Sequence, residues 1–374
     1  MGSVMKFLRY VPYFEALLVA TITASIVMIF LHKAAYAPQS TTLEGEGPVA
    51  TNEPESYNFE DTDDTINIVL IGHGGAGHPG GGLADTIQLL HIEPDTRRAA
   101  LISIPRDLWV AVPARSDRSD SRKINEAYAI GISDTMEPLK QPKYSGTNGG
   151  GTLIKDVVST IIGAEVDYYA AIDFENFKLA VDTLGGINVE IPVTFDDYFY
   201  PVPGLENETC GLTNEQIEEA HRLYSGFELE KQFTCRYEHL HFDQGVNTLD
   251  GSTALKFVRS RHSDQHGGDF ARAQRQFALL VGIKNKLLSL NALQNSRQLY
   301  DQFSDMIRTD IGVGALSPII ELIGNPDEYN VSHVQLSTAN TLMESRSSSG
   351  QFILIPKTGE NNWTEVQNFI WGSL

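Results

Sequence analysis

A long apolar run near the start of the chain limits where the rest of the protein can fold. Residues 10–31 read YVPYFEALLVATITASIVMIFL, with no charged residue from Ala16 to Leu31. As a helix this run is about 30 Å long, close to the thickness of the hydrocarbon core of a bilayer. It therefore predicts one transmembrane helix, with all the following residues on one side of a membrane.

The residues beside the run indicate its orientation. Basic residues flank it on both sides, with a mild bias that favours residues 1–9 in the cytoplasm. A cleaved signal peptide is the alternative, and Ala35-Tyr36-Ala37 offers a cleavage site. The length of the run favours a retained anchor, so we expect a single-pass protein of the cell membrane with most of the chain extracytoplasmic.

The rest of the chain consists of a linker and a globular part. Residues 32–64 are rich in Pro, Gly, Ser, Thr and acidic residues, which is typical of a flexible linker. Residues 65–374 regain apolar patterning and predict one domain. The net charge of −20 argues against nucleic acid as a partner, and so against a transcription regulator, because a phosphate-tracking surface needs excess Lys and Arg. An anionic ligand must be held by local arginine clusters.

Short β-branched runs and helical patterns alternate along the domain. Strands are expected at 66–71, 86–92, 99–104, 166–173, 187–191 and near Val334 and Phe352. Helices are expected at 152–162, 174–184, after the N-caps Asp250 and Asp269, and around 363–371. A Glu93-Pro94-Asp95 turn predicts a hairpin. The pattern predicts an α/β domain of three layers, with helices flanking a central mixed β-sheet.

A polar, tyrosine-rich stretch at 194–248 interrupts this alternation, and we interpret it as an insertion. It contains both cysteines of the chain, Cys210 and Cys235. Two cysteines are too few for a scaffold built on disulfides, so the choice lies between one bridge and two unpaired thiols. The expected extracytoplasmic location favours the bridge.

Candidate site residues lie near the ends of the first strands. The glycine-rich loop at 72–82 is not a Walker loop, because no Gly-Lys-Ser/Thr follows it. Asp85 begins the next strand, where a carboxylate suits magnesium or simply caps a turn. Arg106 and Asp107 follow the third strand. They form either a surface ion pair or a site in which the arginine binds phosphate.

An arginine cluster is the strongest signal in the sequence. Four arginines occur within seventeen residues of an acidic chain, and three residues of the second helix lie at spacing i, i+3 and i+4, on one face. Cations at a helix start repel one another and the helix dipole unless an anion binds between them. The cluster predicts a phosphate or pyrophosphate site. Its members are Arg259, Arg261, Arg272, Arg275 and Gln276.

Six segments, in order and spacing, match a known family between about Ile66 and Gln276. They are 84–86, 103–107, 123–128, 173–186, 249–261 and the group Asp269, Arg272, Arg275 and Gln276. This set resembles the LytR–CpsA–Psr family of cell-wall glycopolymer transferases. The resemblance implies a membrane anchor followed by an extracytoplasmic α/β domain.

The resemblance also implies a reaction. A polyprenyl-pyrophosphate-linked glycan binds with its lipid in an apolar tunnel, a peptidoglycan hydroxyl attacks, and polyprenyl phosphate leaves. The resemblance implies that Asp85 holds Mg²⁺ (or Mn²⁺). It implies catalytic roles for Arg106, Asp107, Arg259 and Arg261. The pyrophosphate ligands it implies are Arg106, Lys123, Asn125, Arg259, Arg261, Arg272, Arg275 and Gln276.

One departure from the family affects the expected metal site. Family members carry an aspartate after the glycine of the first strand, where this chain reads Gly72-His73-Gly74-Gly75. Either the metal site is leaner, or His73, His78 or Asp107 compensates. Two other functions remain open: a pyrophosphatase with water as the acceptor, and a non-catalytic module that binds the lipid carrier or the glycan. The presence of Asp85 favours an enzyme over the module.

Overall fold

The computed structural model describes residues 65–76, 78, 80–289, 306–311, 319, 322–323 and 328–374. The predicted anchor at 10–31 and the linker at 32–64 lie outside these residues. Among the residues that the structure describes, no helix is both long enough and apolar enough to cross a membrane. The chain divides into two compact units, with boundaries at Ala180/Val181 and at Leu287/Leu288.

The first unit is built on a six-stranded sheet with the order β11-β6-β1-β2-β3-β12. Its strands are β1 (Ile66–His73), β2 (Ala84–Glu93), β3 (Arg98–Ser103), β6 (Tyr168–Asp173), β11 (Ile307–Thr309) and β12 (Asn330–Gln335). β1 pairs antiparallel with β2 and parallel with β6, and β2 and β3 form the predicted hairpin. Parallel pairing needs long crossovers while a hairpin needs only a turn, so the sheet is mixed.

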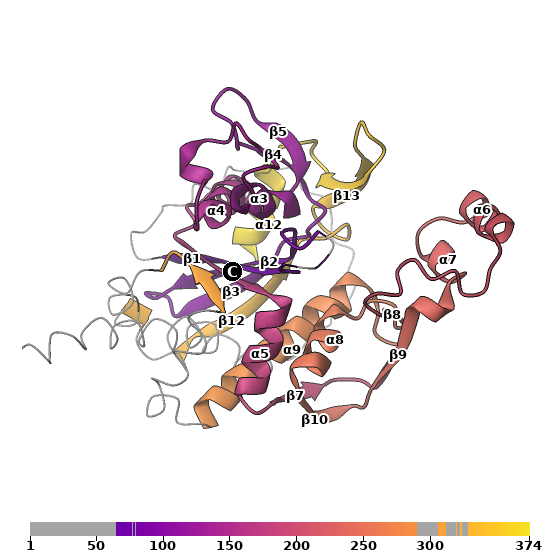
Figure 1. Ribbon diagram of the computed structural model, residues 1–374. Helices are drawn as coiled ribbons and strands as arrows, with labels where there is room; N and C mark the ends of the chain where they lie inside the picture. The colour runs from indigo at the N-terminus through magenta and orange to yellow at the C-terminus, as the bar shows by residue number, and fades with distance from the viewer. Residues whose placement is uncertain are drawn as a thin grey trace, which may run out of the picture. The chain divides into compact units, whose positions relative to one another are not determined.

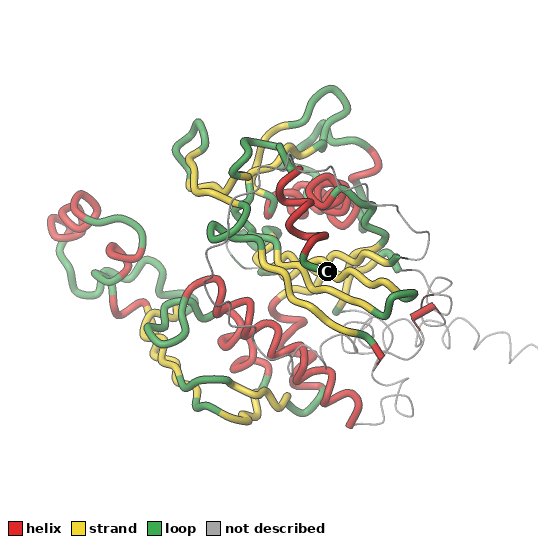
Figure 2. The backbone as a smooth tube through the Cα atoms, turned by 180° about the vertical axis from the view of Figure 1, so that it is seen from behind, coloured by secondary structure: helices red, strands yellow, loops and turns green. Residues whose placement is uncertain are grey.

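Among the described residues of this unit, two small strand pairs and the helices α3, α4 and α12 accompany the sheet. The pairs are β4 (Trp109–Val112) with β5 (Asp120–Lys123), and β13 (Leu342–Arg346) with β14 (Phe352–Pro356). Helices α3, α4 and α12 gather on one face of the sheet (Figure 1), and the view from behind shows the same layer (Figure 2). Their bounds are α3 (Asn125–Ile132), α4 (Gly149–Ile162) and α12 (Thr364–Gly372), with a short η1 (Pro142–Tyr144) between the first two.

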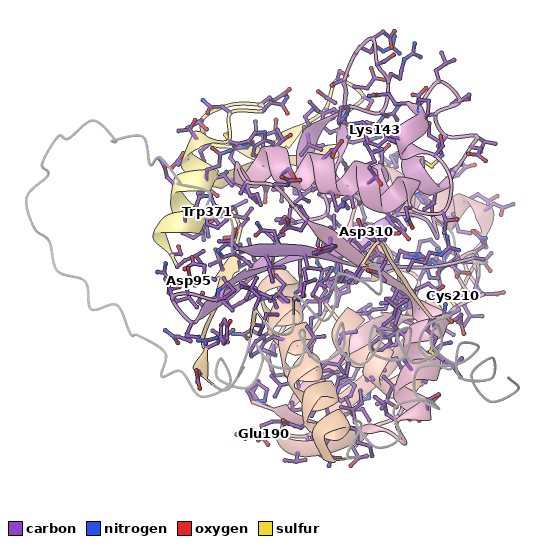
Figure 3. The ribbon with its side chains drawn as sticks, turned by 90° about the vertical axis from the view of Figure 1, so that its left-hand side faces the viewer. Asp95, Lys143, Glu190, Cys210, Asp310 and Trp371 are labelled. Carbon is purple, nitrogen blue, oxygen red and sulfur yellow. A yellow bond between two sulfur atoms is a disulfide. The ribbon has the colours of Figure 1, made fainter. Side chains whose placement is uncertain are left out.

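The core of the first unit lies between this helical layer and the sheet. Leu153 and Val157 of α4 pack in one cluster with Val69 of β1 and Leu89 of β2. The indole Nε1 of Trp371, labelled on α12 in Figure 3, donates to the carbonyl that ends α4, that of Ile162, at 2.8 Å. The predicted α/β class, with a central mixed sheet flanked by helices, is confirmed.

The second unit contains a long antiparallel ribbon. Its strands are β7 (Ile187–Ile191), β8 (Phe195–Pro201), β9 (Tyr237–Phe242) and β10 (Gly245–Leu249), with β7 paired to β10 and β8 to β9. Between β8 and β9 the chain forms α6 (Asn214–Leu223), α7 (Phe227–Glu230) and η2 (Thr234–Arg236). Cys210 and Cys235 are joined by a disulfide within this segment (Figure 3). The predicted insertion at 194–248 therefore contains β8, β9, most of β10 and the helices between β8 and β9.

Three further helices follow the predicted pattern, with one difference at a cap. They are α5 (Phe174–Thr183), which crosses the boundary of the units, α8 (Gly251–Arg259) and α9 (Gly268–Ser289). Asp250 caps α8, since its Oδ1 accepts the N–H of Thr253 at 2.7 Å. The prediction that Asp269 caps α9 is wrong, because this helix already begins at Gly268.

Helices α3 and α4 approach each other through glycines, which generates a stability prediction. A Cβ on Gly131 would lie 2.3 Å from the Cα of Gly150 and 2.4 Å from the carbonyl carbon of Gly149. Backbone atoms cannot rotate away from such a clash, so we expect Gly131→Ala to lower the free energy of unfolding by about 1–3 kcal/mol. Thermal unfolding measures the loss.

The matched control is Gly372→Ala at the end of α12, where a Cβ would meet no atom within 4 Å. We expect this variant to keep the wild-type melting temperature. Equal melting temperatures for the two variants would contradict the close approach of α3 and α4.

Candidate functional site

A β-bulge sets the position of Asp85. Gly72 pairs with Thr86 but His73 pairs with Ala84, so Asp85 is the extra residue on β2. A bulge bends its strand and changes the direction of a side chain. The Asp85 carboxylate, 33% exposed, accepts a hydrogen bond from Nη1 of Arg106 through Oδ1 at 2.5 Å.

Arg106 and Asp107 lie in a short turn after β3. The backbone N–H of Leu108 donates to the carbonyl of Pro105 at 3.1 Å, which closes the turn. The N–H of Asn125 donates to the carbonyl of Arg106 at 3.3 Å, so the start of α3 is attached to the same turn. Local backbone hydrogen bonds therefore hold Arg106 and Asn125 next to each other.

The charged side chains alternate in sign along this cluster. Nζ of Lys123 donates to Oδ1 of Asp107 at 2.5 Å, and Nε of Arg106 lies 3.6 Å from Oδ2 of Asp107. With Asp85 included, acidic and basic side chains alternate in the order Asp85, Arg106, Asp107 and Lys123. Each cation is neutralised by a carboxylate, so the cluster is stable in an acidic chain while keeping two cations available to phosphate.

Two buried polar atoms at this cluster have no hydrogen-bond partner among the described residues. They are Nε of Arg106 and Oδ1 of Asn125. A buried polar atom without a partner costs about 1–3 kcal/mol, so such atoms are rare in native proteins. One is a donor and the other an acceptor, which suits a ligand that carries both an anionic oxygen and a hydroxyl group.

His73, the last residue of β1, is buried beside the ring of Tyr128, with ring centroids 5.1 Å apart. Its Nδ1 lies 3.1 Å from the carbonyl of Gly81, so Nδ1 carries the proton and donates it. Burial lowers the pKa of His73, and the imidazole is neutral at pH 7. The hydrogen bond attaches the glycine-rich loop to the sheet, a structural role for this histidine.

Two charged residues near His73, Asp173 and Arg308, are not among the site residues predicted from the sequence. Asp173 ends β6 and pairs with His73 across the parallel strands; its carboxylate also caps α5 by accepting the N–H and the Nδ2–H of Asn176, both at 2.8 Å. Burial lowers the pKa of His73, and the positive charge of Arg308 on β11 adds to that lowering. Burial raises the pKa of Tyr128, and the charge of Arg308 opposes that rise. No periodic pattern marks Arg308 in the sequence.

In the second unit a buried carboxylate organises the first part of the arginine cluster. Asp197 on β8 is 1% exposed. Its Oδ2 accepts the hydroxyl of Ser260 at 2.7 Å and the backbone N–H groups of Arg261 and His262 at 3.0 and 3.1 Å. Its Oδ1 accepts the N–H of Phe199 at 2.9 Å. Asp197 thus fixes the backbone of the loop that follows α8.

Arg275 differs from the expectation of a ligand-binding side chain. It is 1% exposed, and its guanidinium donates to the carbonyls of His266, at 2.6 Å, and of Ser260, and lies over the ring of Phe195 at 4.9 Å. Burial lowers the pKa of Arg275 to about 10, so it stays charged at pH 7. These contacts favour a structural role, and the expected role as a pyrophosphate ligand stays a prediction. A helical spacing does not reveal that a neighbouring loop covers one member of the face.

The other cluster members are half-buried. Arg259 ends α8, and its Nη1 donates to the hydroxyl of Tyr200 at 3.3 Å. A cation in the last turn of a helix is favoured by the dipole, which explains its place there. The remaining half-buried members are Arg261, Arg272 and Gln276.

The predicted residues therefore fall into two groups, one in each compact unit. The first unit holds Asp85, Arg106, Asp107, Lys123 and Asn125, and the second holds Arg259, Arg261, Arg272, Arg275 and Gln276. For a metal, the first group offers the carboxylates of Asp85 and Asp107, which are paired with Arg106 and Lys123 respectively. His73 and His78 do not gather with acidic residues into a three-ligand group in the described part of the chain.

A family model described as the LytR_cpsA_psr family matches residues 32–366, so the chain belongs to this family. The resemblance inferred from the sequence is confirmed.

Two curated relatives illustrate the similarity. The polyisoprenyl-teichoic acid–peptidoglycan teichoic acid transferase TagU of Oceanobacillus iheyensis is 26% identical, over 69% of this chain and 62% of that protein. The cell wall biosynthesis protein LcpA of Corynebacterium glutamicum is 27% identical, over 58% of this chain and 35% of that protein. The chain thus matches less than two thirds of the length of these relatives.

Solved structures share the fold. The protein gbs0355 from Streptococcus agalactiae matches with a TM-score of 0.56 and 20% identity, over 83% of this chain and 88% of the other. TagV of Bacillus subtilis matches with a TM-score of 0.52 and 18% identity, over 82% and 96% of the two chains. At this identity the likeness describes the architecture alone.

The contacts of Arg275 predict a loss of stability on its removal. Arg275→Ala would leave the carbonyls of Ser260 and His266 without their charged donor inside the unit. Hydrogen bonds to charged groups contribute about 1.5–3 kcal/mol each, so we expect a loss of about 3 kcal/mol in urea unfolding. Arg222→Ala removes a 68%-exposed arginine paired with Glu219 and should change stability little. Similar midpoints for both variants would refute the structural role.

The pKa of His73 predicts a pH dependence. Burial lowers it below the ordinary value of 6.5, so the unfolded chain binds the proton more readily than the folded protein. The stability contributed by neutral His73 is complete above about pH 6.5 and is lost as the pH falls below that value. We expect the unfolding free energy of His73→Asn to fall less steeply than that of the wild type between about pH 6.5 and 5. Parallel slopes in urea titrations would contradict this assignment.

Proposed function

We propose that the protein is a phosphotransferase that moves a glycopolymer from a polyprenyl-pyrophosphate carrier onto peptidoglycan and releases polyprenyl phosphate. Family membership supports the reaction class, and the names of relatives such as TagU support the donor and the acceptor. We further propose that residues 10–31 anchor the chain in the cell membrane with the domain outside the cytoplasm. The disulfide supports an oxidising compartment.

The observation that carries the proposal is the environment of Arg106. Its side chain is 32% exposed and is held by Asp85 and the turn after β3. Its buried Nε lies 3.6 Å from Oδ2 of Asp107 and makes no hydrogen bond to the described residues. A guanidinium is a planar fork of donors that matches phosphate oxygens. A phosphate oxygen would satisfy this Nε, and a sugar hydroxyl would satisfy Oδ1 of Asn125.

In this reaction the acceptor hydroxyl attacks the phosphorus that carries the glycan. The bond from this phosphorus to the bridging oxygen breaks, the electron pair leaves with polyprenyl phosphate, and the hydroxyl proton passes to water. Such reactions depend mainly on positioning and on neutralising charge. Arg106 and Lys123 supply positive charge, and Asp107 acts as a positioning residue between them.

A divalent metal fits Asp85. Magnesium in phosphoryl-transfer sites is often held by one or two carboxylates together with the substrate phosphates, so a single carboxylate is sufficient. When bound, Mg²⁺ or Mn²⁺ would neutralise charge on the phosphate oxygens. A phosphate that receives the donors of Arg106 would compete with Asp85 for them, which would release this carboxylate to the cation.

In the second unit, we propose that Arg259, Arg261, Arg272 and Gln276 bind phosphate oxygens. The carboxylate of Asp197 and the guanidinium of Arg275 keep the loop from Ser260 to His266 in shape for this role. Arg275 is thus a positioning residue, while Arg259 and Arg261 keep the catalytic role expected for them.

Full-length protein in detergent, incubated with a polyprenyl-pyrophosphate oligosaccharide and a peptidoglycan fragment, tests the function. We expect Mg²⁺-dependent release of polyprenyl phosphate, with the glycan joined to the acceptor through phosphate in the mass spectrum. Free glycan phosphate would indicate a pyrophosphatase, and binding without release would indicate a non-catalytic module.

Variants test the residues. Losing one preorganised charged donor costs about 10²–10³-fold in kcat, so we expect losses of this size in Arg106→Ala. We expect Asp85→Asn to lose its response to Mg²⁺. Arg346→Ala, which changes an exposed arginine of β13, is the control and should retain wild-type turnover. Wild-type turnover in Arg106→Ala would overturn the site assignment.

A further inference from the structure

The ribbon of the second unit carries a cluster of two histidines and an aspartate. Asp196 on β8 lies directly opposite His241 on β9, and His239 lies two residues away on the same face. Alternate residues of a strand share a face, so these three side chains point outward while Asp197 and Leu240 point inward and are buried. Nε2 of His239 and Nδ1 of His241 lie 2.7 and 2.8 Å from the same oxygen, Oδ1 of Asp196.

Neighbouring groups hold both imidazoles in place. The other ring nitrogen of His241, Nε2, lies 3.2 Å from Oδ1 of Asp243. The ring of His239 stacks on that of Tyr198, with centroids 4.1 Å apart and planes 5° apart. Metal-binding histidines usually donate their second N–H to a carboxylate, which fixes the ring and the tautomer. Asp243 stands in this position relative to His241.

The arrangement requires a positive charge between the groups. A neutral imidazole carries a proton on only one of its two nitrogens. Each nitrogen of His241 faces a carboxylate oxygen, so a second proton or a metal cation must lie between Nδ1 and Asp196 when Nε2–H donates to Asp243. Asp196 and Asp243 add negative charge. The cluster therefore suits either a doubly hydrogen-bonded imidazolium or a divalent metal.

We propose that Asp196, His239 and His241 form a binding site for a divalent transition metal of the zinc type. The three ligand atoms lie within 4.8 Å of one another, and tetrahedral zinc with bonds of about 2.0–2.1 Å places its ligand atoms about 3.3 Å apart. Small side-chain movements would bring the three atoms to that spacing. Two imidazoles and one carboxylate favour zinc over magnesium, which prefers oxygen ligands alone.

The bound metal would act as a clip between β8 and β9. It would join the two strands at one point of the ribbon, as the disulfide joins the segment between them. Three protein ligands leave the fourth position of zinc open to water or to an anionic oxygen. The site uses none of the residues assigned to glycopolymer transfer, so its test is independent of that function.

Calorimetry with ZnCl₂ tests the site on full-length, chelator-treated protein in detergent. We expect one zinc ion per chain, no binding by Mg²⁺ at the cluster, and a higher melting temperature with zinc. Co²⁺ in place of zinc should give visible absorption bands typical of tetrahedral coordination.

His239→Gln, His241→Gln and Asp196→Asn should each abolish the binding and the rise in melting temperature. Asp243→Asn should weaken the affinity by about 10-fold, as expected for a group that orients a ligand. His221→Gln, which changes an exposed histidine of α6, is the control and should bind zinc like the wild type. The ligand side chains are partly or fully exposed, so these variants should fold, which circular dichroism without zinc verifies.

Zinc affinity that is unchanged in His239→Gln and His241→Gln would overturn the proposal. The proposal would also be overturned if no zinc bound and if the melting temperature rose at acidic pH in the wild type but not in the variants of Asp196, His239 and His241. That outcome would assign the cluster to a protonated imidazole bridge.

Discussion

The pairing of β1 with its two neighbours is the constraint on which the first unit depends. The antiparallel neighbour β2 begins next to the last residue of β1, and the parallel neighbour β6 ends next to that residue. His73, Asp85 and Asp173 consequently lie at one edge of the sheet although they come from three strands. β3 returns antiparallel to β2, which brings Arg106 to the same edge. The charged cluster is thus a product of strand order, and the bulge at Asp85 adjusts it locally.

Two arginines illustrate how surroundings decide the role of one side chain. Arg106 is partly exposed and held by carboxylates, which can exchange for the oxygens of a phosphate. Arg275 is buried and held by backbone carbonyls, which cannot leave without unfolding the loop. In the proposed function, the same guanidinium group therefore serves recognition in one unit, while its contacts serve folding in the other. The two roles differ because the hydrogen-bond partners differ: side-chain carboxylates for Arg106 and backbone carbonyls for Arg275.

Much of this organisation could be predicted from the sequence. The runs at 66–71, 86–92 and 99–104 gave strands in the expected places because buried strands need β-branched residues, and Asp250 was recognised as a cap from its position before a helical pattern. The grouping of Asp85 with Arg106 follows from the predicted hairpin. The remainder depends on tertiary contacts: a helical spacing places Arg275 on a face without showing that a loop covers it. Likewise, His239 and His241 mark one face of a strand, but only its pairing with β8 reveals Asp196.

The disulfide has a consequence for the integrity of the chain after a proteolytic cut. Cys210 and Cys235 enclose α6 and α7, the part of the second unit richest in exposed residues. Proteases cut most readily in such segments. A cut between the two cysteines would leave both pieces covalently attached, and β8 and β9 would remain paired. The segment between Cys210 and Cys235 can therefore be cut once without separation of the two pieces. Reduction of the disulfide removes this covalent link.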